Sequence, residues 1–170
     1  MKKLSDILIA VGVFVIGLVI FTALLMRGFA PSEARLAIYT QHMLQHGWSW
    51  IPQAYAGLQG FNFSTVVSLA YLSAVKLGHL TVFTAAVPSA IASGITLAFV
   101  YLLGALRDRS WGLVAVLLVV GTEAFFLTSR SLSYAPYITA IVTMSIYFVV
   151  EFEQQRVGLY FTQGILFFLG

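Results

Sequence analysis

Uncharged apolar runs, long enough to cross a membrane, recur along the chain between short polar segments. The first run, residues 7–26, contains twenty residues without a charge. At about 1.5 Å per residue it would form a helix of roughly 30 Å, which matches the hydrocarbon thickness of a bilayer. A cleavable signal peptide has a shorter apolar core, about 7–15 residues, so the run predicts an uncleaved membrane anchor.

Further apolar runs follow the first one. We predict additional spans at residues 82–106, 111–128 and 134–150, and an incomplete span at 157–170. The last run would give only roughly 21 Å of helix, and it ends without a polar tail. The sequence therefore predicts an all-α fold, a multi-spanning transmembrane helix bundle that forms a single transmembrane domain over residues 1–170. It also predicts that the chain is part of a longer protein.

Residues 27–81 are predicted to form one external segment that carries two interfacial helices. The first is an amphipathic juxtamembrane helix over about 32–46, followed by Gly47 as a stop signal. The apolar side chains that recur in it at helical spacing are Leu36, Tyr39, Met43 and Leu44. The second helix covers about 61–77, where hydroxyl side chains interrupt a run at the short limit for a span.

Basic residues give the expected orientation. Lys2 and Lys3 favour a cytoplasmic N-terminus. If Arg107 and Arg109 share that side, an even number of crossings must separate the two pairs, and the spans at 7–26 and 82–106 supply two. We therefore expect a multi-pass membrane protein with its N-terminus in the cytoplasm.

Composition supports a membrane protein and removes several functions. Apolar residues make up 60% of the chain and charged residues 9%, with a mean hydropathy of +0.95, whereas soluble domains carry about a quarter charged residues. The absence of cysteine excludes disulfides, thiolate metal sites and a cysteine nucleophile. The net charge of +3 comes from scattered residues, so we expect membrane lipids and no nucleic acid as partners.

Three charged residues flank the predicted external ends of the spans. Glu33 and Arg35 begin the first external helix, and Arg130 follows the span at 111–128. If these ends meet, a carboxylate lies beside two guanidinium groups, which could hold a phosphate and deprotonate a hydroxyl. The alternative is that Glu33 caps its helix, with Ser32, while the arginines reach lipid phosphates.

Two other polar features are candidates for chemistry. Glu123 lies inside the span at 111–128, where an acid is costly; it is either a site residue or a polar contact between helices, with Thr122 beside it. His42 and His46 are four residues apart, but no HExxH pattern is present. We interpret them as surface histidines, and the sequence predicts no metal site.

The order of several short motifs resembles a known family. The motifs are Pro31-Ser32-Glu33-Ala34-Arg35-Leu36-Ala37, Met43-Leu44, Gly47-Trp48, Ile51-Pro52, Gly60-Phe61, Tyr71-Leu72, Lys76-Leu77-Gly78, Val87-Pro88-Ser89-Ala90, Val100-Tyr101-Leu102-Leu103-Gly104, and Phe125-Phe126-Leu127 with Arg130. Together they resemble the N-terminal third of membrane glycosyltransferases of the aminoarabinose transferase and protein O-mannosyltransferase superfamily, of the GT-C type. These enzymes carry Pro-Asp-Glu-x-Arg-Tyr-Ala in the first external loop.

The resemblance implies an enzyme that takes a sugar from a polyprenyl-phosphate donor and transfers it to a lipid or protein acceptor on the non-cytoplasmic side. It implies that Glu33 is catalytic and that Arg35 and Arg130 bind the donor phosphate. It implies no cofactor besides the donor substrate, and leaves metal use open.

The chain departs from the family at its acidic positions. Ser32 stands where the family has its Asp, and Ala135 stands where a second acid is expected after Arg130. The family's Glu-Lys-Pro-Pro stretch is absent. Because a hydroxyl cannot replace a carboxylate as a base at neutral pH, a non-catalytic membrane subunit that binds lipid or a partner protein is the alternative. A transporter that uses Glu123 is a third hypothesis.

Overall fold

The computed structural model describes residues 2–23, 31–47 and 64–152. These residues form helices and no strand, which confirms the predicted all-α class. The helices are α1 (Lys2–Thr22), α2 (Pro31–His46), α3 (Ser64–Leu77), α4 (Val82–Ala105), α5 (Arg109–Val120), α6 (Glu123–Ser129) and α7 (Ala135–Phe152). The predicted incomplete span at 157–170 lies outside the described residues.

Two helices are long and apolar enough to cross a membrane. They are Leu4–Thr22, with a mean hydropathy of 2.7, and Val82–Ala105, with 1.8. A third crossing is added if α5 and α6 are counted as one bent span. The apolar part of α7 is shorter than these spans. The helices indicate a membrane protein.

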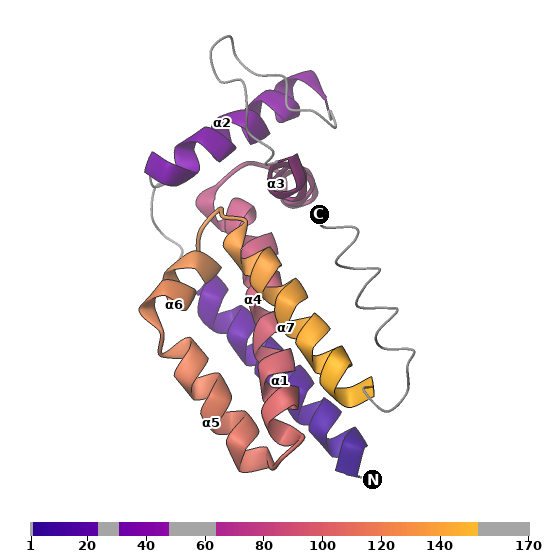
Figure 1. Cartoon of the computed structure of the whole chain (residues 1–170). Coiled ribbons are helices and arrows are strands. Elements are labelled where there is room, and N and C mark those ends of the chain that lie inside the picture. Colours follow the sequence, from indigo (N-terminus) through magenta and orange to yellow (C-terminus); the bar gives the residue numbers. More distant parts are fainter. Residues whose placement is uncertain (1, 24–30, 48–63, 153–170) are drawn as a thin grey trace.

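The long helices run side by side, and α2 and α3 lie across one end of them (Figure 1). Helix α4 lies between α1, α5 and α7 (Figure 1). The end of α1, the start of α2, and α6 lie at the end of the molecule opposite the N-terminus (Figure 1). This arrangement gathers several polar helix ends in one region.

The predicted span at 111–128 is wrong as a single helix. Helix α5 ends at Val120, and α6 begins at Glu123 with a bend of 76°. Thr122 adopts an extended backbone, with φ −78° and ψ 116°, and its hydroxyl donates to the Leu118 carbonyl at 3.1 Å. An extended residue cannot continue the helical hydrogen-bond ladder, and Glu123 then begins a new helix with a favourable negative charge in its first turn.

Small residues let the backbones of α4 and α5 approach closely. A Cβ atom at Gly104 would lie 2.6 Å from the Gly112 Cα atom, and one at Gly112 would lie 2.7 Å from the Tyr101 carbonyl oxygen. On the side that faces α1, a Cβ at Gly94 would lie 2.9 Å from the ring of Phe14. Close backbone packing of this kind stabilises helix pairs in lipid, where the hydrophobic effect contributes little.

The amphipathic face of α2 packs against α3 and the start of α4. Leu36, Tyr39 and Met43, which the spacing places on one face, are all buried. They form a cluster with Ala70 of α3 and Leu132 of the loop before α7. This cluster fixes the position of α2 relative to the α6–α7 loop.

Candidate functional site

The carboxylate of Glu33 is buried at the start of α2. Glu33 lies in the first turn of the helix, and the residue is only 2% exposed. Its Oε1 atom accepts the backbone N–H of Leu132 at 3.0 Å. The bond joins the start of α2 to the loop between α6 and α7. A carboxylate bonded to a buried N–H is both oriented and held in place.

Arg130 lies two residues earlier on the same loop. Its Nη2 atom donates to the carbonyl oxygen of Ala23, at the end of α1, at 2.8 Å. The guanidinium carbon lies 5.1 Å from the centre of the Phe126 ring. The last carbonyls of a helix have no partner within it, so this arginine satisfies one of them and places positive charge at the negative end of α1.

The structure brings part of the sequence-predicted site together. Glu33 and Arg130 lie at the same end of the helices, and the Leu132 contact links Glu33 to the loop that begins at Arg130. The backbones of Ser32 and Arg35 belong to the first turns of α2. Nothing is described of the side chains of these two residues.

The remaining sequence candidate, Glu123, lies elsewhere at this end, as does the position at which the family's second acid is missing. Glu123 was expected inside a span, but it is the exposed first residue of α6, because the helix breaks at Thr122. Ala135 is the first residue of α7, and its methyl group offers no acid next to Arg130. Among the described residues, Glu33 is therefore the carboxylate joined to this loop.

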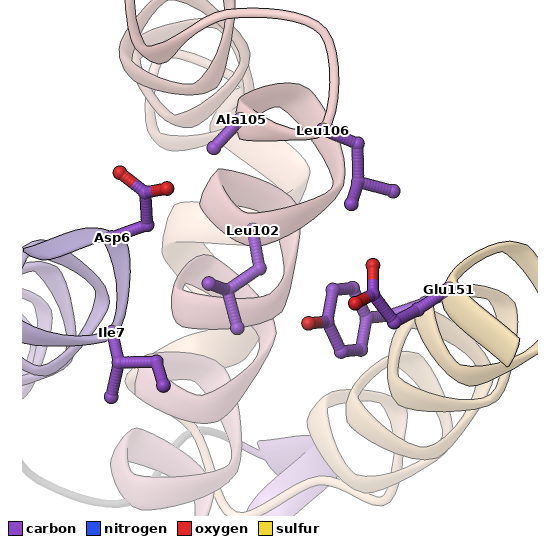
Figure 2. A pocket seen from close by; sticks show the side chains of 7 residues that line it. Asp6, Ile7, Leu102, Ala105, Leu106 and Glu151 are labelled. Atoms are coloured by element: carbon purple, nitrogen blue, oxygen red, sulfur yellow. The ribbon is translucent and has the colours of Figure 1, made fainter. Parts of the chain in front are cut away.

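The opposite end of the molecule contains a pocket that sequence reasoning missed. It has a volume of about 90 Å³ and is lined by Asp6, Ile7, Leu102, Ala105, Leu106, Tyr147 and Glu151. Figure 2 shows Asp6 on α1 and Glu151 on α7, on either side of Leu102 on α4. Two acids in the sequence could have indicated it, since Asp6 directly precedes the apolar run at 7–26 and Glu151 directly follows the run at 134–150.

An ion pair joins α1 to the first residue of α5 beside this pocket. Arg109 Nε lies 2.6 Å from Asp6 Oδ1, and its Nη2 donates to Ser5 Oγ. Asp108 accepts the N–H of Ser110 at 3.1 Å and caps α5. That backbone hydrogen bond holds the pKa of Asp108 below its ordinary value.

Metal ligands are sparse in the part of the chain that the structure describes. No group of three or more His, Cys, Asp or Glu side chains there could hold a metal ion. No protein-family model, curated protein or solved structure matches this chain.

Proposed function

We propose that this chain is the N-terminal part of a membrane glycosyltransferase that uses a polyprenyl-phosphate-linked sugar. In this proposal it is a multi-pass protein of a bacterial inner membrane, with Lys2 and Lys3 in the cytoplasm and Glu33 on the other side. The acceptor is a lipid or a protein. The short motifs that resemble the family, and the meeting of α1, α2 and the α6–α7 loop, support it.

The observation that carries the proposal is the oriented Glu33 carboxylate next to the Arg130 loop. A base needs a fixed direction toward the hydroxyl that it deprotonates, and a backbone N–H bond supplies such a direction. Arg130 precedes Leu132 by two residues, and its guanidinium is a group that binds phosphate well. Arg35, in the same helix turn as Glu33, is assigned to the donor phosphate by the resemblance alone.

A non-catalytic membrane subunit is the second candidate, and the burial of Glu33 favours it. A carboxylate that is 2% exposed and bonded to a backbone N–H also serves as a clamp between helix α2 and the α6–α7 loop. The presence of Ser32 and Ala135 at the family's acidic positions also favours a non-catalytic role. In this role the scaffold would bind lipid or a partner protein without transferring a sugar.

The test is sugar transfer by the full-length protein from a radiolabelled polyprenyl-phosphate donor in membranes. We expect Glu33→Gln to reduce the rate by roughly 100-fold, because general-base catalysis contributes about 10²–10⁴-fold. Glu123→Gln is the matched control, since Glu123 is exposed at the same end, and its rate should stay within about twofold.

The outcomes separate the two candidates. A loss of transfer of roughly 100-fold in Glu33→Gln, while the variant keeps its melting temperature, supports catalysis by Glu33. Full activity of Glu33→Gln would reject Glu33 as the base. The absence of transfer by the full-length protein, with donor binding retained, would establish the subunit instead.

A further inference from the structure

The turn between α4 and α5 carries an arginine stacked on a tryptophan. The guanidinium carbon of Arg107 lies 5.1 Å from the centre of the Trp111 ring, and both residues are exposed. The face of an indole ring attracts a cation, so this contact holds the long arginine side chain over the first turn of α5. Because a guanidinium stacks through its flat face, the N–H groups in its plane remain available as donors.

The other charged residues of this turn have partners. Arg109 pairs with Asp6 of α1 at 2.6 Å, and the Asp108 carboxylate accepts the N–H of Ser110 at 3.1 Å. Within the described part of the chain, the side chain of Arg107 makes no hydrogen bond or ion pair besides its contact with the indole ring. Arg107 is therefore the residue of this turn whose donors can bind an anion outside the chain.

An exposed apolar face of α5 begins at the same tryptophan. Gly112 packs α5 against α4, and the opposite side of the helix carries apolar side chains that are 45–71% exposed. These side chains belong to Trp111, Leu113, Val114, Leu117 and Leu118. Helix α5 has 12 residues, about 18 Å at the rise of a helix, which is close to half the hydrocarbon thickness of a bilayer. The apolar face therefore reaches through roughly one leaflet.

A cation at one end of an apolar face matches the two parts of an anionic lipid. The forked N–H groups of a guanidinium fit the oxygens of a phosphate, and tryptophan settles at the level of the head groups. A zwitterionic head group carries its own cation beside the phosphate. An anionic head group has no such cation, so its negative charge is left for Arg107.

We propose that Arg107, Trp111 and the exposed face of α5 form a binding site for an anionic phospholipid. The phosphate of the head group binds the Arg107 guanidinium, and an acyl chain lies along the face that contains Val114 and Leu118. The turn lies at the end of the molecule that holds the N-terminus, opposite the end that holds Glu33 (Figure 1). The site therefore does not depend on the proposed transfer of a sugar.

Quenching of Trp111 fluorescence by lipids with brominated acyl chains tests the proposal. The chain has three tryptophans, so the double substitution Trp48→Phe/Trp50→Phe leaves Trp111 as the only one. The full chain with this background is reconstituted into phosphatidylcholine vesicles that contain a minor share of brominated phosphatidylglycerol or brominated phosphatidylcholine. We expect the brominated phosphatidylglycerol to be enriched about fivefold beside Trp111, an effect of the size that one arginine has at an anionic membrane surface.

Two arginine variants locate the site. Arg107→Gln should reduce the enrichment to less than about twofold, because it removes the cation that faces the head group. Arg109→Gln is the matched control, since it removes the same charge two residues away from an arginine that Asp6 holds. In that variant the enrichment should stay above about threefold. Both arginines are exposed, so circular dichroism should show intact helices in both variants.

Inorganic phosphate separates a lipid site from a site for the free anion. At equal ionic strength, sodium phosphate and sodium chloride should lower the enrichment equally, through screening alone. A larger loss in phosphate would assign Arg107 to a soluble anion and overturn the lipid site. Equal quenching by the two brominated lipids would overturn it as well. An equal loss of enrichment in the two arginine variants would show attraction by net charge and no site at Arg107.

Discussion

Charged residues connect helices at both ends of the molecule, but in different ways. At the Glu33 end, Glu33 and Arg130 bond to backbone groups of Leu132 and Ala23. At the Asp6 end, Asp6 pairs with Arg109, with side chains that are 22% and 48% exposed. At the first end each charged side chain bonds to a backbone group, whereas at the second end two oppositely charged side chains bond to each other near the surface.

This difference predicts unequal contributions to stability. An exposed ion pair contributes about 0–1 kcal/mol, because solvent screens it and both side chains lose freedom. Removing the partner of a buried N–H costs about 1–3 kcal/mol, because the donor is left without a hydrogen bond. Similar sequence features, one acid and one arginine at the ends of apolar runs, thus serve two different structural purposes.

Glu33→Ala should have the largest effect. We expect it to lower the free energy of unfolding in detergent by about 3 kcal/mol, because it leaves the buried N–H of Leu132 unpaired and opens a cavity. Chemical denaturation followed by circular dichroism measures the change. The matched control is Glu123→Ala, at an exposed position, with an expected change within about 0.5 kcal/mol. Equal effects in the two variants would remove the distinction between buried and exposed carboxylates.

Gly104→Ala tests packing at the Asp6 end. A Cβ there would lie 2.6 Å from the Gly112 Cα and 2.7 Å from its backbone nitrogen, so α4 and α5 must separate. Overpacking of this kind costs about 1–3 kcal/mol. Gly12→Ala is the control, because no atom lies within 4 Å of a Cβ at that position. A melting temperature unchanged by Gly104→Ala would contradict the close approach of the helices.

Asp6→Asn should have a smaller effect. It weakens the pair with Arg109 and should cost less than about 1 kcal/mol. The difference from the wild type should shrink further in 1 M salt, where the screening length is about 3 Å. A loss as large as that of Glu33→Ala, measured by the same denaturation, would show that the two ends are equivalent.

The smallest effect is expected at the start of α5. This helix end should become less stable in acid, because Asp108, which caps it, is then protonated. The folded pKa of Asp108 is lowered, first by the N–H of Ser110, so its contribution is present above the unfolded value and is lost as the pH falls through the folded pKa. The protection of the Ser110 amide, which is its exchange rate compared with that of an unstructured amide at the same pH, should therefore fall in acid. Asp108→Asn keeps a capping side chain that does not titrate. Its Ser110 amide should show no such loss of protection, and identical pH profiles of protection for both proteins would exclude Asp108 as the cause.

The presence of the helices could be predicted from sequence, because the spacing of apolar residues indicates which face of a helix is buried. The face of α2 made by Leu36, Tyr39 and Met43 follows from their spacing. The break at Thr122 could not be predicted from apolarity, since the run continues through it. A single extended backbone residue and one hydroxyl bond to Leu118 decide it.

The candidate site was predictable only in part. Glu33 and Arg130 each adjoin an apolar run, which is visible in the sequence. Their hydrogen-bond partners are the Leu132 N–H and the Ala23 carbonyl. Every residue except proline has both of these backbone groups, so the residue type does not identify them as partners. Sequence therefore suggested that the two charges meet, and could not show that each is held by main-chain atoms.

The glycine contact between α4 and α5 has a mechanical consequence. Where two main chains touch at Gly104 and Gly112, no flexible side chain remains between them to absorb sliding. We therefore expect α4 and α5 to move together, and the 76° break between α5 and α6 lets α6 change its direction without separating them.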